Sequence, residues 1–519
     1  MPGMGNGDIG RRQLRPFASG GVRAPASGIR PLDVAVAAAV VMLSVLATAV
    51  VATLPTPSPL IVAGVLVGLA LPIWLATTRR LGLALIILLL YLGLADGVIK
   101  LTTGSPVATL GRDVLLYAIT IGALVRLLAL RRPIVLPPLS GWVIAFSAVV
   151  LIQLVGPESN GLAHSVASLR QHLEFVPLFF LGYAMVQSGD RLRTFMWGLV
   201  VVAAINGLAG FIQIQLTPDQ LSSWGPGYQA LIHGTGDVSA RLAFDTQGDF
   251  FGVRPFALGS DSGFGGILGM LAIPAVLALF STTRRPSLLV VLSVLSVGVA
   301  AGVATSQARV AIVGSVIAAL AYLALVVNTR RGLSTVLAVG LAGLATVVVI
   351  SGVQNAAAGD AFARLDGITP DKVLQTTFDY RQDTFSLLPT YVREYPFGAG
   401  LGTVGPASAT LSATDAIELD GESQPSFLLI ELGVIGAVVF IAFNLRLLLL
   451  AVRCRRLKDD LRPLMAAVGA PLFAIFATGF VGATSTSTPA APYFWFAAGI
   501  LAYWLAAPRR SRADDGAGP

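Results

Sequence analysis

Charged residues are scarce in this sequence. Of its 519 residues, 12% are Asp, Glu, Lys or Arg, whereas soluble globular proteins usually have about 25%. More than half of the residues, 55%, are hydrophobic, and the mean hydropathy is +0.79. In water, a protein with this many apolar residues would form large hydrophobic cores, and it would need more charged surface residues than this sequence has to cover them. The composition therefore excludes an ordinary soluble protein and predicts a chain that uses the lipid bilayer as its solvent.

Cysteine and histidine are nearly absent as well. The single cysteine, Cys454, excludes a disulfide within the chain and argues against a thiolate metal cluster. The histidines His164, His172 and His233 are too scattered in the sequence to predict a metal site. We therefore expect neither a metal nor a cofactor. The net charge of +8 is mostly due to arginine, and membrane topology explains it better than nucleic-acid binding does.

Long apolar stretches occur throughout the chain. A helix needs about 20 mainly apolar residues to cross a bilayer, and about fourteen stretches within residues 32–507 pass this test. The sequence therefore predicts an all-α, polytopic membrane domain over residues 32–507. Residues 1–31 are rich in Gly, Pro and Arg and predict a disordered tail, and residues 508–519 form a second tail.

The basic residues orient this domain. With residues 1–31 in the cytoplasm, the tails and alternate connections on that side hold 25 of the 35 basic residues, and the outer side holds the other 10. Basic residues accumulate in cytoplasmic loops. We therefore predict a multi-pass protein of the cell (plasma) membrane with both termini in the cytoplasm.

Two connections, residues 215–262 and 354–425, are much longer than the rest, and both fall on the outer side. Long ordered loops are usually functional, so we expect the active or binding site on that face. In the second loop, Thr369-Pro370-Asp371 is a good helix start. Apolar residues at helical spacing follow it as far as Pro389 and predict an amphipathic helix that lies on the membrane or caps a cavity.

A glycine-rich stretch, Tyr395–Gly402, follows that helix. Such a turn can bind phosphate through backbone N–H groups. The alternative is a re-entry turn that uses glycine only for positive φ angles. We favour the alternative, because no Walker-type lysine and hydroxyl follow the glycines.

Four arginines are predicted at or near the outer ends of helices: Arg112, Arg170, Arg254 and Arg309. Arg309 belongs to a polar break, Thr305–Arg309, between two apolar segments. An arginine near hydrocarbon is costly and tends to be paired or functional, and its planar fork suits phosphate. The alternative for any one of them is a side chain that reaches the lipid headgroups. Their convergence on one face predicts a diphosphate-binding site.

Three segments resemble the O-antigen ligase and polymerase superfamily, which transfers lipid-linked glycans on the outer membrane face. Thr305–Gly314 resembles a Ser-Arg helix start, Tyr380–Gly402 resembles an Arg followed by Pro-[Leu/Phe]-Gly-x-Gly-x-Gly, and Glu422–Gly436 resembles a Glu-x-Gly-x-x-Gly helix. Arg254–Gly259 is similar to a further family segment. The resemblance implies a GT-C-like glycosyltransferase architecture.

The same resemblance implies a mechanism. The donor would be a glycan on undecaprenyl diphosphate, and an acceptor hydroxyl would displace the lipid diphosphate with inversion at the anomeric carbon, without a metal or nucleotide sugar. Carried over by position, Arg309 and Arg381 would bind the diphosphate, with Arg254 and Arg170 as weaker candidates. Membrane lipids and other polysaccharide export or chain-length proteins would be its partners.

One position departs from the family. Its ligases have a His-Asn pair where this chain has Glu422 and Ser423. A carboxylate can still take the proton of the acceptor, so Glu422 is the candidate general base. The departure favours a polymerase, or a ligase for another acceptor, over a lipid A core ligase.

Two other functions stay open at this point. A polytopic transporter or flippase for a lipid-linked or small polar substrate would place more ionisable residues at mid-membrane; Asp96 and Glu174 are the few candidates. A non-catalytic assembly or sensor role is the third.

Overall fold

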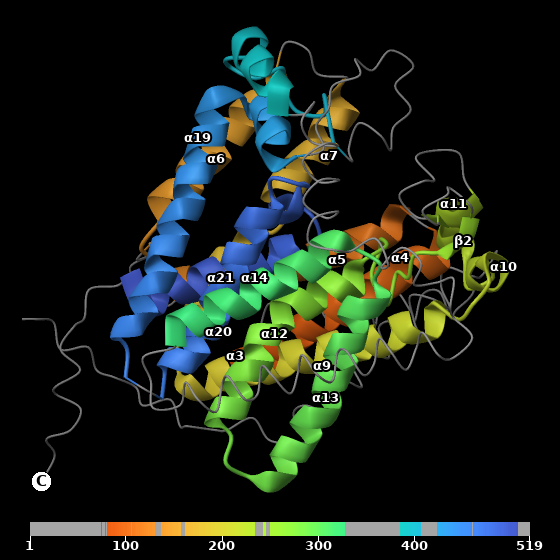
Figure 1. Ribbon diagram of the computed structural model, residues 1–519. Coiled ribbons are helices and arrows are strands. Elements are labelled where there is room, and N and C mark those ends of the chain that lie inside the picture. Colours follow the sequence, from red (N-terminus) through yellow and green to blue (C-terminus); the bar gives the residue numbers. More distant parts are fainter. Residues whose placement is uncertain are drawn as a thin grey trace, which may run out of the picture.

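The computed structural model describes residues 80–104, 106–129, 136–156, 161–233, 242–244, 250–326, 385–405, 423–458 and 460–506, with Trp74 and Thr78. These residues form a helical bundle with one short two-stranded sheet (Figure 1). The predicted α-helical class is confirmed. Both predicted tails, residues 1–31 and 508–519, lie outside the described residues, as does most of the predicted loop 354–425.

Six of the described helices are long and apolar enough to cross a membrane: Gly82–Thr103, Gly189–Gln213, Phe264–Thr282, Pro286–Thr305, Arg309–Val326 and Gln424–Arg456. Three shorter apolar helices accompany them: Ser140–Val155, Arg462–Thr478 and Ala490–Ala506. These helices are consistent with a membrane protein. The count of about fourteen crossings stays a prediction.

The elements have the following bounds. The first half contains α3 (Leu81–Leu90), the π-helical turn η1 (Tyr91–Ala95), α4 (Asp96–Thr103), α5 (Pro106–Ala129), α6 (Ser140–Ile152), η2 (Gln153–Val155), α7 (Leu162–Leu173), α8 (Pro177–Met185), α9 (Gly189–Gln213), α10 (Pro218–Ser222) and α11 (Pro226–His233). The second half contains β1 (Leu242–Phe244), β2 (Phe250–Val253), α12 (Phe264–Thr282), α13 (Pro286–Thr305), α14 (Arg309–Val326), α19 (Gln424–Val452), η5 (Arg453–Arg456), α20 (Arg462–Thr478), η6 (Thr484–Thr486), α21 (Ala490–Leu501) and η7 (Ala502–Ala506).

The helices pack closely because small residues lie where their backbones cross. A Cβ atom at Gly207 of α9 would lie 1.8 Å from the carbonyl oxygen of Gly298 on α13. One at Gly499 of α21 would lie 2.0 Å from the carbonyl oxygen of Phe179 on α8. Close backbone approach of this kind drives helix association where no water is present to favour burial.

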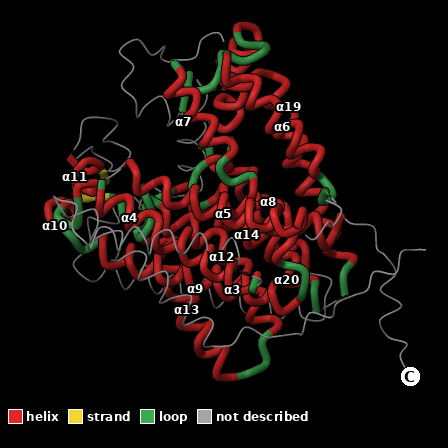
Figure 2. Tube along the Cα trace, turned by 180° about the vertical axis from the view of Figure 1, so that it is seen from behind, coloured by secondary structure: helices red, strands yellow, loops and turns green. Residues whose placement is uncertain are grey.

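The helix termini gather at two ends of the bundle (Figures 1 and 2). We call one the hairpin end: it contains the end of α9, then α10, α11, β1 and β2, and the junction of α13 with α14. The other is the basic end, which contains the α12–α13 turn with Arg284 and Arg285, and the basic segment 453–462 after α19. There Arg455 donates to the Ala324 carbonyl at 2.6 Å and ties η5 to α14.

The predicted first outer loop, residues 215–262, contains ordered structure. Thr217 and Gln220 form a reciprocal capping box that starts α10. Strand β1 pairs antiparallel with β2, with an irregularity between Ala243 and Phe244. A small core joins these elements to α4: Leu101, Leu221, Tyr228, Ile232, Val253 and Phe256. Burial in this core raises the pKa of the Tyr228 phenol to about 12.

Two predicted helices have different bounds in the structure. The apolar stretch near residues 170–187 is not one helix, because it breaks at residues 174–176 between α7 and α8. Pro177 opens α8, and because proline has no backbone N–H it cannot donate the hydrogen bond to the Leu173 carbonyl that would continue α7. The amphipathic helix predicted after Thr369 is described only over residues 385–394, which are helical and continue past Pro389.

Candidate functional site

A polar break separates α13 from α14 at the hairpin end. Ser306 and Gln307 are both buried, each with 2% of its surface exposed. Gln307 has a φ of 53°, a left-handed conformation that ends a helix. The Ser306 hydroxyl accepts a hydrogen bond from the Ala308 amide at 3.3 Å and donates one back to α13 at 2.9 Å. The polar break predicted over Thr305–Arg309 is therefore present and well ordered by its own hydrogen bonds.

Arg309 is the first residue of α14, directly after this break. Its side chain is partly buried, and its Nε is buried without a hydrogen-bond partner. It forms no ion pair with any other residue that the structure describes. The first turn of a helix has free N–H groups and a partial positive charge. Together, the guanidinium and the helix start favour a bound anion.

Arg254 lies at the same end of the bundle, at the close of β2. Its neighbour Val253 and the nearby Phe256 are buried in the core shared with α11. A Cβ atom at Gly210 of α9 would lie 3.9 Å from Pro255 and 3.1 Å from the Thr305 hydroxyl. One residue of α9 thus contacts both the segment after Arg254 and the last residue of α13.

Two amide side chains of α9 hold that segment in place. Gln213 donates to the Ala257 carbonyl at 2.7 Å and accepts from the Ala257 amide at 2.7 Å. Asn206 accepts from the Leu258 amide at 3.0 Å and donates to the Gly93 carbonyl at 2.7 Å. Both amides are buried. The segment beginning at Arg254 is therefore fastened to the end of α9, beside the α13–α14 break.

A second polar group is formed by Asp96, Arg112, Asp113, Arg170 and Glu174, which we call the charge cluster. Arg112 of α5 binds both carboxylate oxygens of Glu174, one of them at 2.9 Å, and Asp96 of α4 at 2.8 Å. Arg170 of α7 pairs with Asp113 at 2.7 Å and lies 3.7 Å from Glu174. Three acids and two arginines give the cluster a formal charge of −1.

The charge cluster explains two of the four predicted outer arginines. Arg112 is 13% exposed and makes three ion-pair hydrogen bonds, so its charge is balanced within the protein. Arg170, at 32% exposure, has two carboxylate partners. A diphosphate would have to compete with these carboxylates for either arginine.

A third polar group, the Glu431 network, consists of Ser168, His172, Gly402 and Glu431. Glu431 of α19 accepts from the Ser168 hydroxyl at 2.5 Å, from His172 Nε2 at 2.8 Å and from the Gly402 amide at 2.8 Å. Its side chain is fully buried, and the His172 ring stacks on Phe427.

Helix α7 connects the two networks. Ser168 and His172 are four residues apart, so they share one face, and that face holds Glu431. Arg170 and Glu174 are also four apart, about 200° around the helix from the first pair, and they hold the charge cluster. One helix thus separates α19 from α5.

The amides of the glycine-rich turn, residues 396–403, are largely used inside the protein. Ala399 donates to the Ile430 carbonyl at 2.7 Å, and Leu401 donates to the Gln153 carbonyl at 3.2 Å. Gly398 donates to the Tyr395 carbonyl at 3.0 Å. Since Gly402 donates to Glu431, these four amides are not free to bind phosphate. The turn is a structural one, which is the alternative that the sequence favours.

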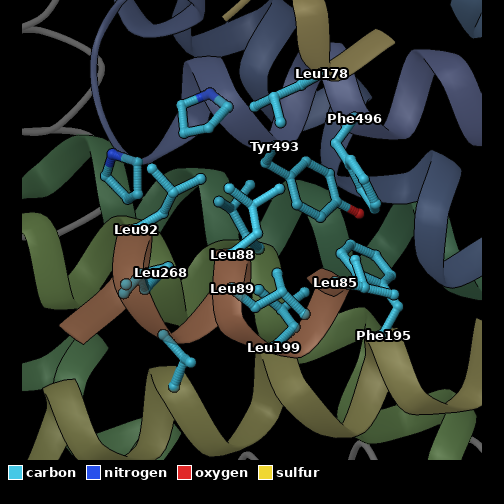
Figure 3. A pocket seen from close by; sticks show the side chains of 15 residues that line it. Leu85, Leu88, Leu89, Leu92, Leu178, Phe195, Leu199, Leu268, Tyr493 and Phe496 are labelled. Atoms are coloured by element: carbon cyan, nitrogen blue, oxygen red, sulfur yellow. The ribbon is translucent and has the colours of Figure 1, made fainter. Parts of the chain in front are cut away.

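An apolar pocket lies between α3, α8, α9, α12 and α21 (Figure 3). Its walls include Leu88, Leu92, Leu199 and Phe496. The one hydroxyl among its lining side chains belongs to Tyr493, which donates to backbone carbonyls of α20 at 3.0 and 3.2 Å. Without a polar anchor, this pocket is not a candidate for binding a glycan or a diphosphate.

The structure thus places the predicted site residues in three situations. Arg254 and Arg309 lie at the same end of the bundle, around the end of α9. Arg170 belongs to the charge cluster. Arg381 and Glu422 lie outside the described residues, so their roles stay predictions. Within the described ranges, no three His, Cys, Asp or Glu side chains are grouped to hold a metal ion.

The sequence interpretation missed the Glu431 network. His172 counted only as one of three scattered histidines, and Glu431 only as a position in a motif. A signal was available: Ser168 and His172 are four residues apart, and Glu431 is a lone acid in the second turn of an apolar helix. Their pairing across about 260 residues is not encoded in any local pattern.

No family model matches this chain, and no curated protein sequence is significantly similar to it. The function is therefore argued from the site itself and from the short motifs around it.

Proposed function

We propose that this protein is a membrane glycosyltransferase of the O-antigen ligase and polymerase type. It would transfer or polymerise an oligosaccharide linked to undecaprenyl diphosphate, on the outer face of the cytoplasmic membrane. The observation that carries the proposal is Arg309: a partly buried guanidinium at a helix start, whose Nε has no hydrogen-bond partner. A buried donor without a partner is costly, and a diphosphate oxygen would satisfy it.

Arg254 supports the same proposal by its position. It follows β2 directly and precedes a segment that α9 fastens beside Thr305, at the end of α13. Two arginines at the same end of the bundle suit a ligand with two phosphate groups, because guanidinium binds phosphate in a bidentate manner. Arg381, which resembles the family arginine before the glycine-rich turn, would be the third contact.

The reaction needs charge stabilisation more than covalent chemistry. An acceptor hydroxyl attacks the anomeric carbon of the donor sugar, and its proton passes to a carboxylate, for which we propose Glu422. The bond from the anomeric carbon to the diphosphate oxygen breaks, and the lipid diphosphate leaves with the electron pair. Arg309 at the start of α14 would stabilise this developing negative charge, which is where such enzymes gain most of their rate.

The distribution of charge supports the proposed orientation. The basic end contains Arg284 and Arg285 and the exposed residues Arg453, Arg455 and Arg456. Because basic residues accumulate on the cytoplasmic side, this end would face the cytoplasm and the hairpin end the exterior. Arg254 and Arg309 would then lie where lipid-linked glycans are assembled into surface polysaccharide.

The test compares Arg309→Ala with Arg285→Ala, a matched arginine at the opposite end. In a strain that depends on this protein, we expect Arg309→Ala to abolish the surface polysaccharide and to leave lipid-linked precursor in the membrane. Arg285→Ala should make full-length product. Single repeat units in the accumulated precursor indicate a polymerase, and finished chains indicate a ligase. Normal polysaccharide from Arg309→Ala would refute the site.

The charge cluster favours a second candidate, a transporter or flippase. Asp96 and Glu174 are buried, and a transport path commonly contains such groups. Here both are paired with Arg112, which argues for a structural role. A flippase would leave the precursor facing the cytoplasm when the protein is absent. A lectin or enzyme that reaches only the outer leaflet separates these outcomes.

A further inference from the structure

The glycine-rich turn is joined to α19 by backbone hydrogen bonds at a kink in that helix. Gly433 of α19 has φ 68° and ψ −175°, a conformation outside the helical region. At this kink Ile430 and Val434 do not share the usual helical hydrogen bond. Instead the Ile430 carbonyl accepts from Ala399 at 2.7 Å, and the Val434 amide donates to the Pro396 carbonyl at 3.0 Å. The turn therefore replaces one hydrogen bond of the helix.

The fit between the turn and the kink is close. A Cβ atom at Gly433 would lie 2.4 Å from the carbonyl carbon of Phe397. One at Gly398, where φ is 91°, would lie 2.8 Å from the Glu431 carbonyl oxygen. Both positions need glycine for conformation and for space. The turn can hold this position only while its glycines keep positive φ angles.

Side chains from η2 and α7 hold the other side of the turn. Gln153 donates to the Phe397 carbonyl, and its own carbonyl accepts from Leu401 at 3.2 Å. Ser165 donates to the Leu401 carbonyl at 3.2 Å. Glu431 completes the set, since it accepts from the Gly402 amide while Ser168 and His172 bind its other oxygen. The Glu431 side chain thus contacts both the turn and α7.

The turn lies between two segments that matter for the proposed reaction. Residues before it lead from Arg381 through the helix at residues 385–394, and residues after it lead through Glu422 to Ser423, the N-cap of α19. Fixing the turn therefore fixes the described helix at residues 385–394 relative to the start of α19.

We propose that Glu431 is a positioning residue: held by Ser168 and His172, it locks the glycine-rich turn into the kink of α19 and so fixes the helix at residues 385–394 relative to α19. In the sequence, Arg381 precedes that helix and Glu422 precedes α19. This inference rests on the proposed glycosyltransferase function. Glu431 does not touch substrate, because its side chain is fully enclosed. Its effect on the reaction passes through the Gly402 amide.

Hydrogen–deuterium exchange tests the anchor without reference to activity. In the full-length protein in lipid nanodiscs, we expect Glu431→Ala to speed exchange in the peptide covering residues 397–405 by about 10- to 100-fold. Exchange across α12 and α13 should not change. Glu431→Gln keeps an acceptor for Gly402 and an amide that can pair with Ser168, so it should restore most protection. Glu394→Ala, which removes an exposed acid just before the turn, is the matched control.

The second arm measures glycan product from the same variants. We expect Glu431→Ala to lose at least about tenfold of product while Glu431→Gln and Glu394→Ala keep it. Unchanged exchange in the turn of Glu431→Ala overturns the anchor. Faster exchange with full product overturns the positioning role. Uniformly faster exchange over the whole protein also overturns it, because Glu431 would then be a general stability residue.

The two proposals fail in different ways. If Arg309→Ala makes normal product, the glycosyltransferase site is wrong. The exchange experiment on Glu431→Ala still tests the anchor, because it does not depend on activity. If Arg309→Ala loses product and Glu431→Ala does not, only the positioning role of Glu431 is wrong.

Discussion

Two arginines of this protein, Arg112 in the charge cluster and Arg309 at the α13–α14 break, are both partly buried but have opposite surroundings. Arg112 contacts Glu174 through two nitrogens and Asp96 through a third, and its guanidinium lies 5.1 Å from the centre of the Phe175 ring. Arg309 has a buried Nε without a hydrogen bond and pairs with no acid that the structure describes.

This difference indicates that Arg112 has a structural role, whereas Arg309 is available to bind a ligand. Burying an ion is tolerated when a partner ion and hydrogen bonds compensate the lost hydration, and Arg112 meets that condition. Arg309 has no such partner among the described residues, so a bound anion would stabilise it there. Mutations at the two positions should therefore affect different properties: folding at Arg112 and activity at Arg309.

The largest expected effect is that of Arg112→Ala on stability. It leaves the buried carboxylates of Asp96 and Glu174 without their shared cation, which costs about 3–5 kcal/mol. We expect little folded protein in detergent, measured by size-exclusion profile and melting temperature. If this variant has the melting temperature of the wild type, Arg112 does not have the structural role that we assign to it.

Arg309→Ala should come next, with its effect on activity. Loss of one donor to a leaving-group charge typically lowers the rate about 10²- to 10³-fold, or about 2.7–4 kcal/mol. The melting temperature should not fall, because Arg309 supports no described ion pair. Arg309→Lys keeps the charge but not the fork, and we expect intermediate product. Initial rates of glycan transfer check both variants.

Arg170→Ala sharpens the comparison, since the sequence assigned Arg170 to the diphosphate and the structure pairs it with Asp113 and Glu174. Its side chain is 32% exposed, so water screens these pairs. We expect a loss of about 1 kcal/mol in stability and unchanged glycan product. A strong loss of product at normal stability would instead indicate that Arg170 binds the diphosphate.

The smallest effect is expected for Arg285→Ala. Arg285 is exposed at the basic end, in the turn that precedes α13. A surface change of this kind alters stability by less than about 0.5 kcal/mol. Product and melting temperature should both match the wild type. A loss of product here would show that arginine substitutions act through topology and not through a site.

Local patterns in the sequence predicted the features that depend on local physics. The polar break at Thr305–Arg309 interrupts two apolar runs, so hydropathy alone locates it. The glycines of the turn likewise predict positive φ, which the structure has at Gly398, Gly400 and Gly402. Apolar length also predicted the long apolar helices that are described, such as α9, α12, α13 and α19, although Pro177 divided one predicted span.

Contacts between distant residues were beyond this approach. Nothing near Glu431 in sequence points to Ser168 or His172, because the partners belong to separate apolar helices. The distinction between Arg170 and Arg309 was equally hidden, since both look like arginines at helix ends. Only the fold reveals that Arg170 pairs with Asp113, whereas Arg309 pairs with no acid that the structure describes.

The most direct test of the central claim uses the purified protein in nanodiscs with a defined undecaprenyl-diphosphate oligosaccharide as donor. Transferred or polymerised glycan is measured for the wild type, Arg309→Ala and Arg285→Ala. The account predicts product from the wild type and Arg285→Ala, and at least about 100-fold less from Arg309→Ala at equal melting temperature. Equal product from Arg309→Ala, or none from the wild type, would contradict it.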